Sequence, residues 1–195
     1  MADFIATHWL DITTTILGLA YILLEYRASV WMWVVGFFMQ ALGIVLYYQK
    51  GLYADCGMEV YYILMTIYGF YRWTTKGQQG QKSSAAVPIR HFPRRLVLPW
   101  LAVIGVVWAA IYWLLVTFTN SNVPLADSFT TALSIIGIWA LAHKYLEQWF
   151  IWIAVDVVTS ILYFYKDIPF KAGLYALYVV IAIMGYRKWR RMVAA

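Results

Sequence analysis

The chain has 195 residues, of which 64% are hydrophobic and only 12% are charged, and its formal net charge is +6. Soluble domains carry about twice that charged fraction, so the composition excludes an ordinary soluble enzyme, and a mean hydropathy of +0.68 predicts a multi-pass membrane protein. The length predicts one compact membrane domain, 1–195, without an additional large soluble domain.

Apolar runs bounded by charged or turn residues predict seven membrane-spanning helices. In chain order these helices cover 9–24, 30–48, 57–73, 96–118, 128–142, 148–165 and 170–187. Several have only about 15–18 residues, which is near the lower limit for crossing the hydrocarbon core. The expected fold class is therefore an all-α polytopic membrane protein.

The distribution of lysine and arginine predicts an orientation with the N-terminus outside and the C-terminus inside. In this orientation 12 of the 15 basic residues lie in inside segments, mainly in the loop 74–95 and near the C-terminus. Only Lys50, Lys166 and Lys171 lie outside. Such an excess of positive charge marks cytoplasmic segments. The basic residues therefore indicate topology, and we expect the lipid bilayer rather than nucleic acid as their partner.

The two halves of the sequence align without a gap when the first is shifted by 116 positions. The matched pairs include Asp11 with Asp127, Trp33 with Trp149, Lys50 with Lys166, Gly69 with Gly185, and Trp73 with Trp189. This predicts two parallel three-helix repeats, 9–73 and 125–189, separated by a cytoplasmic loop, 74–95, and a linker helix, 96–118. Transporters built from such repeats bind substrate where the repeats meet, near the middle of the membrane.

One face of the predicted helix 148–165 combines two indoles with an acid. Trp149, Trp152, Asp156 and Tyr163 fall at i, i+3, i+7 and i+14. A charged Asp near the centre of a span costs about 2.5–3.5 kcal/mol on insertion scales, and indole faces attract flat or cationic ligands. The pattern favours a site for an organic cation. The alternative is that Asp156 hydrogen-bonds to neighbouring helices and only specifies packing.

Three further polar residues are candidates for the same site. Gln40 corresponds to Asp156 under the 116-residue shift, and it either contacts the ligand or satisfies the opposite helix. Glu59, with Tyr62 three residues later on the same face, either joins the site or lies solvated at the outer interface. The three histidines are isolated, so the sequence predicts no metal site and no cofactor.

The stretch W149-F-I-W152-I-A-V-D156 resembles the W-x-x-W-x-x-x-Asn/Asp signature of the Pnu family of bacterial vitamin transporters. The preceding Lys144, the later YFYK and the segment GLYADCGMEVYYILMTIYGFYRW are similar to the family as well. The resemblance implies a 3+1+3 fold related to the SWEET sugar carriers, often assembled as a homotrimer in the bacterial inner membrane. It also implies facilitated diffusion by alternating access, with metabolic trapping of the vitamin by a cytoplasmic kinase.

The residue types at two positions bear on the substrate. Family members that carry nicotinamide riboside typically have Asn at position 156 and Gln at position 59, whereas this chain has acids at both. Thiamine is a cation whose aminopyrimidine suits a carboxyl group, so the resemblance favours the thiamine-transporting PnuT branch. Asp156 would balance the cation, Glu59 would read the aminopyrimidine, and Trp149 and Trp152 would line the path. The alternative substrate is nicotinamide riboside or another nucleoside-like vitamin.

Two other classes of protein fit the sequence less well. An intramembrane enzyme with Asp156 and Glu59 as an acid–base pair would need a nucleophile or a metal, and no such motif is present. A membrane sensor signalling through the loop 74–95 would need a recognisable interaction motif there. We therefore expect a transporter and not an enzyme.

Overall fold

The computed structural model describes residues 2–49, 53–75, 88–119, 122–165 and 169–193. It divides into two compact units, Met1–Val87 (unit 1) and Pro88–Ala195 (unit 2), and each is described by itself. The described residues form seven α-helices and no named strand. This confirms the all-α prediction.

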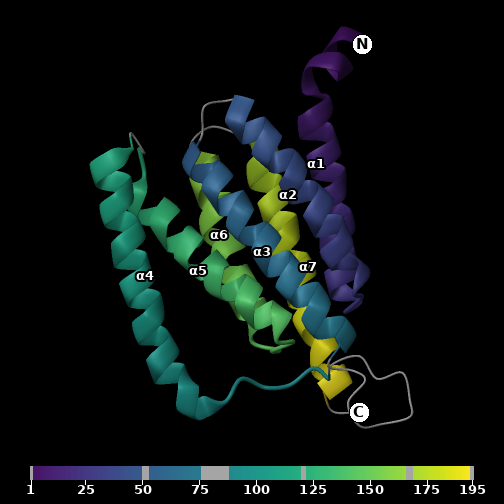
Figure 1. Cartoon of the computed structure of the whole chain (residues 1–195), viewed down its shortest axis with the longest axis vertical. Helices are drawn as coiled ribbons and strands as arrows, with labels where there is room; N and C mark the ends of the chain where they lie inside the picture. Colours follow the sequence, from purple (N-terminus) through teal and green to yellow (C-terminus); the bar gives the residue numbers. More distant parts are fainter. Residues whose placement is uncertain (1, 50–52, 76–87, 120–121, 166–168, 194–195) are drawn as a thin grey trace. The chain divides into compact units, whose positions relative to one another are not determined.

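Unit 1 consists of α1 (Ala2–Tyr26), α2 (Trp31–Gln49) and α3 (Tyr53–Thr75). The middle helix, α2, packs against both α1 and α3 (Figure 1). It is apolar on nearly every face, as expected for a helix with neighbours on one side and lipid on another.

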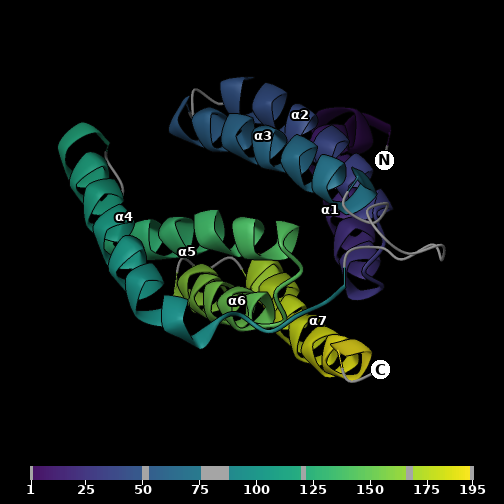
Figure 2. The ribbon, with the colours of Figure 1, turned by 60° about the horizontal axis from the view of Figure 1, so that its bottom comes forward.

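Unit 2 begins with a 3-10 turn, η1 (Arg94–Leu96), that continues into α4 (Val97–Phe118). α5 (Pro124–Ala142), α6 (Gln148–Tyr165) and α7 (Pro169–Val193) follow. α5 packs against α4 and α6, and α6 packs against α7, as the ribbon in Figure 2 shows. Pro124 opens α5, where the missing N–H would have had no partner in the helix in any case.

Each of the seven predicted helices falls on one helix of the structure. The ends agree within four residues except at the start of α1, which begins seven residues earlier than predicted, and at the end of α7, which extends six residues further. Among the described residues, α2, α5, α6 and the segment Arg94–Phe118 have the length and hydropathy of membrane spans. The central part of the predicted loop 74–95, residues 76–87, lies outside the described residues. The orientation and the 3+1+3 plan remain predictions.

The turn after α1 and the turn after α5 have the same backbone geometry. Ala28 and Lys144, which are 116 positions apart, both have positive φ, at 51° and 53°. The N–H of Ala28 donates to the Glu25 carbonyl at 2.8 Å, and the next N–H reaches back five residues. The N–H of Lys144 and its successor make the same pair of bonds with the same lengths. Each helix therefore ends in a Schellman motif.

The second and third helices of each predicted three-helix repeat are joined through a tryptophan and a glycine. In unit 2, a Cβ added to Gly185 of α7 would lie 2.5 Å from the Trp149 ring of α6. In unit 1, Gly69 of α3 is approached in the same way by the Trp33 ring of α2. Only a residue without a side chain allows either indole to lie so close to the neighbouring helix.

Between the first and second helices of each predicted repeat, a large aromatic side chain of one helix packs on a glycine of the other. In unit 1, Tyr21 of α1 lies over Gly36 of α2, where an added Cβ would be 3.0 Å from the tyrosine ring. In unit 2 the positions are reversed, because Trp152 of α6 lies over Gly137 of α5, at 3.2 Å. Both pairs are related by the 116-residue shift. The contacts within the two units thus support the predicted equivalence.

Candidate functional site

Asp156 lies within α6 and is 6% exposed. Within the described residues its carboxylate makes no hydrogen bond or ion pair. The Tyr178 side chain of α7 lies within electrostatic range of it. A buried carboxylate without a partner is costly, so packing of the described residues alone gives no reason for an acid at this position.

The two predicted indoles of α6 lie in different surroundings. Trp149 is fully buried and meets Trp189 edge to face, with ring centroids 5.5 Å apart. This placement gives Trp149 a packing role, and its contact with a ligand remains a prediction. Trp152 is half-buried, over Gly137. Its indole Nε1 is buried and has no acceptor among the described residues.

A row of tyrosines connects Tyr163 to the surroundings of Asp156. Tyr163 stacks on Tyr175 of α7, with 5.4 Å between ring centroids and 22° between planes. Tyr175 meets Tyr178 edge to face at 5.6 Å. The sequence analysis named Tyr62 but missed Tyr178, its equivalent under the 116-residue shift. Applying the repeat to every candidate would have found Tyr178.

In unit 1, Gln40 is 4% exposed and is bound to the neighbouring helix. The Thr66 hydroxyl of α3 donates a hydrogen bond to Gln40 Oε1 at 2.9 Å. The sequence left two roles open for Gln40, and this bond favours the role of satisfying the opposite helix. Contact with a ligand remains a prediction.

Glu59 is partly buried and lies against α2. A Cβ added to Gly43 would be 2.9 Å from the Glu59 carboxyl carbon, so the glycine makes room for the acid. Tyr62 lies within electrostatic range of Tyr21 of α1, which is also within range of the buried Glu25. Glu25 was missed by the sequence analysis, because an acid beside Arg27 at the end of a span is typical of an interface.

The structure thus groups Asp156, Trp152, Tyr163 and the missed Tyr178 along α6 and α7 of unit 2. It places Gln40, Glu59 and Tyr62 in unit 1. The predicted site that joins the two groups remains a prediction. Among the described residues, no cluster of His, Cys, Asp or Glu has the composition of a metal site.

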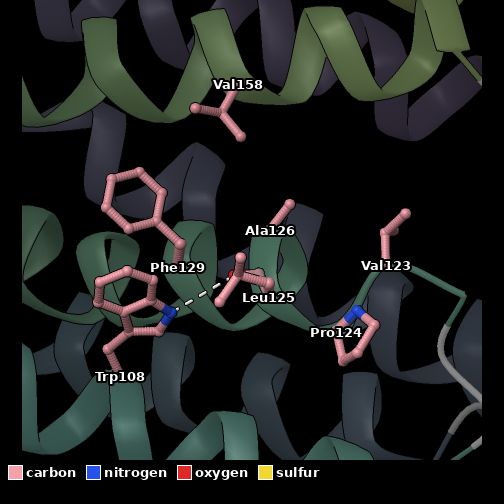
Figure 3. Close-up of a pocket in the computed structure, with 7 residues that line it drawn as sticks. All are labelled: Trp108, Val123, Pro124, Leu125, Ala126, Phe129 and Val158. Carbon is pink, nitrogen blue, oxygen red and sulfur yellow. Dashed lines mark hydrogen bonds between the residues drawn. The ribbon is translucent and has the colours of Figure 1, made fainter.

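An apolar hollow of about 380 Å³ lies among α4, α5 and α6 of unit 2 (Figure 3). Trp108 of α4 and Phe129 of α5 line it, and the Trp108 Nε1 donates to the Leu125 carbonyl at 3.3 Å. Val158 closes it from α6, two residues after Asp156 and therefore on nearly the opposite face of that helix. Among the described residues that line it, the Trp108 N–H is the one polar side-chain group, and it is already bonded within the protein.

The chain segment before η1 is fastened to the turn between α5 and α6. Arg90 pairs with the turn through two backbone hydrogen bonds, from its N–H to the Lys144 carbonyl and from the Leu146 N–H to its own carbonyl. Glu147 accepts a bond of 2.7 Å from the Phe92 N–H and one of 2.9 Å from His91 Nδ1. This small clamp holds residues 90–92 to the turn.

The described helices, several of which have the length and hydropathy of membrane spans, are those of a multi-pass membrane protein with a buried acid among aromatic side chains. The chain belongs to the nicotinamide mononucleotide transporter family, whose sequence model matches residues 8–191. It is a protein of the bacterial inner membrane. The Pnu-type resemblance seen in the sequence is therefore confirmed at the level of the family.

Named relatives cover most of the chain. The riboflavin/roseoflavin transporter RibM of Streptomyces davaonensis is 26% identical over 93% of this chain and 84% of its own length. The nicotinamide riboside transporter PnuC of Escherichia coli is 25% identical with the same two coverages. A crystal structure of the vitamin B3 transporter PnuC matches with a TM-score of 0.77 and 21% identity, over 98% of this chain and 85% of that one. The last comparison establishes the fold.

Proposed function

We propose that the chain is a facilitative transporter that takes up a cationic, heteroaromatic vitamin, with Asp156 recognising its positive charge. The observation that carries this proposal is that a buried acid, Asp156, and a buried indole N–H, that of Trp152, lie one helical turn apart on α6. Among the described residues, neither has a hydrogen-bond partner. An unpaired acceptor beside an unpaired donor fits a ligand that supplies both a cation and a hydrogen-bond acceptor.

Thiamine is the first candidate substrate. Its charge suits Asp156, and its aminopyrimidine suits a second carboxyl group such as Glu59. The named relatives share only about a quarter of this chain's residues, so their names leave its substrate open. Residues Trp149, Trp152, Tyr62 and Tyr163 complete the proposed site, and Gln40 supports it by joining α2 to α3 through Thr66.

Nicotinamide riboside is the second candidate, and the names of the relatives favour it. The transporters of Escherichia coli and Neisseria mucosa, at 25% and 23% identity, are both named for this vitamin. It is also a cation, so Asp156 fits it as well. Riboflavin, named for the Streptomyces relative, is uncharged and serves as the contrasting ligand.

Titration calorimetry of the detergent-purified chain tests the proposal. We expect thiamine to bind more tightly than nicotinamide riboside and both to bind more tightly than riboflavin. Asp156→Asn should weaken binding of the preferred cation by about tenfold or more, because a hydrogen bond to a charged group contributes about 1.5–3 kcal/mol. Asp127→Asn, an acid in the first turn of α5, is the matched control and should bind as the parent does. Tighter binding of riboflavin than of either cation would overturn the proposal.

Transport by facilitated diffusion with trapping by a cytoplasmic kinase makes a separate prediction. In liposomes that contain only the purified chain, labelled vitamin should equilibrate and not accumulate. Adding a kinase for that vitamin and ATP inside should produce accumulation. Accumulation without the kinase would instead indicate coupling to an ion. Light scattering of the detergent-solubilised protein tests the proposed homotrimer.

The proposed orientation, with the N-terminus outside, can be tested with one engineered thiol. Cys56 is the only cysteine, so Cys56→Ser gives a background without thiols. A cysteine placed at Ser84, in the loop 74–95, should react with a membrane-impermeant maleimide only after the cells are permeabilised. Labelling in intact cells would reverse the orientation.

A further inference from the structure

The middle helices of the two predicted repeats, α2 and α6, carry a polar residue at the same position but give it different neighbours. Gln40 of α2 and Asp156 of α6 are 116 positions apart and are both buried. Gln40 is bonded to the Thr66 hydroxyl of α3. The same position in α7 is Ala182, which is fully buried and has no hydroxyl.

The difference lies in the third helix and not in the helix packing around it. The tryptophan–tryptophan contact about two helical turns from each polar residue has the same centroid distance, 5.5 Å, and the same angle, 88°, in both units. At this contact α6 and α7 therefore approach one another as α2 and α3 do. A hydroxyl at position 182 would be placed toward Asp156 as the Thr66 hydroxyl is placed toward Gln40. Its absence leaves the carboxylate without the partner that its counterpart has.

We propose that Ala182 is a specificity-determining residue, because the missing hydroxyl leaves the Asp156 carboxylate available to the positive charge of the substrate. Thr66 has the opposite effect in unit 1, since it commits Gln40 to helix packing. The two equivalent polar residues thus have different tasks, one binding the ligand and one joining helices. The inference rests on the proposed function, since it explains why Asp156 is free to meet a cation.

The inference predicts different effects of a hydroxyl at position 182 and at position 66. A hydroxyl introduced at position 182 would compete with the substrate for the carboxylate. Removal of the hydroxyl at position 66 would leave a buried carbonyl oxygen of Gln40 unsatisfied, which destabilises the fold without touching the ligand. Affinity should therefore respond at position 182, and stability at position 66.

The experiment compares Ala182→Thr with Ala182→Val in the full-length purified chain. The two variants add the same volume and differ in the hydroxyl, so steric effects cancel. With thiamine and with nicotinamide riboside as probes, we expect the Thr variant to bind the preferred cation about fivefold more weakly than the Val variant, the factor that corresponds to one ordinary hydrogen bond. Ala182→Ser, a smaller change, should show the same direction if both larger residues fold poorly.

Three outcomes separate the inference from the proposed function. Equal affinities of the Thr and Val variants, together with weaker binding by Asp156→Asn, would overturn the role of Ala182 and leave the proposed function standing. Unchanged binding by Asp156→Asn, or no binding of either cation by the parent, would overturn both. A loss of affinity in Thr66→Val with an unchanged melting temperature would show that Gln40 binds the ligand, and would overturn its assignment to packing.

Discussion

Trp149 of α6 lies against Gly185 of α7, so close that a Cβ on the glycine would be 2.5 Å from the indole ring. The contact continues edge to face onto Trp189. Trp33, Gly69 and Trp73 form the same group in unit 1. An indole that requires a glycine opposite it therefore holds α2 to α3 in unit 1 and α6 to α7 in unit 2.

Replacing that glycine should destabilise the protein. Gly185→Ala forces the Trp149 ring or the α7 backbone to move, and overpacking of this kind costs about 1–3 kcal/mol. Gly173→Ala is the control on the same helix, because nothing lies within 4 Å of its added Cβ. Thermal unfolding in detergent should show a lower melting temperature for Gly185→Ala and an equal or higher one for Gly173→Ala. The packing argument fails if Gly185→Ala melts at or above the parent temperature.

The turn after α1 makes a prediction of the opposite sign. Ala28 has φ of 51°, a conformation that costs an L-residue about 1–2 kcal/mol and that glycine adopts freely. Ala28→Gly should therefore leave the melting temperature unchanged or raise it. Ala20→Gly, inside α1, should lower it by the equivalent of about 1 kcal/mol. A clear decrease for Ala28→Gly would mean that the turn is not held in this geometry.

The helices could be predicted from the sequence because a bilayer leaves little choice. Backbone groups in lipid must be satisfied within the segment, so each long apolar run has to be a helix. The same periodicity placed Trp149 and Asp156 on one face of α6. It could not show that Trp149 is covered by Gly185, because a helical period identifies a face but not the helix that meets it.

The sequence could not predict which residue each buried polar side chain contacts. Gln40 finds Thr66 on a different helix, 26 positions away, and only the packing of α2 on α3 brings them together. Glu25 looked like an interfacial acid and proved to be buried. The internal repeat also relates Tyr62 to Tyr178 and Thr66 to Ala182, and neither pair served to choose candidate residues.

Removing the Glu147 carboxylate should release the segment that it clamps. Glu147→Gln keeps an acceptor for the Phe92 N–H, whereas Glu147→Ala loses the contacts with both Phe92 and His91. Hydrogen exchange at residues 90–92 should therefore increase strongly in the Ala variant and less in the Gln variant. His91→Ala is the matched control, since it removes the contact of the imidazole with Glu147 and keeps the bond from the Phe92 N–H to the Glu147 carboxylate. Equal exchange in all three would show that the backbone bonds of Arg90 suffice.

Lys144, in the turn between α5 and α6, should make stability depend on pH. Burial of its side chain lowers the pKa of Lys144 from 10.5 to about 8. Between these values the unfolded chain holds the proton that the folded chain has released, so stability rises with pH across this window. The full gain corresponds to about 3 kcal/mol, and below pH 8 the lysine is charged in both states and the dependence disappears. Lys144→Met should melt at a higher temperature than the parent at pH 7, and the difference should shrink as the pH approaches 10.5. A difference that is constant from pH 7 to 10.5 would show that burial does not favour the neutral amine.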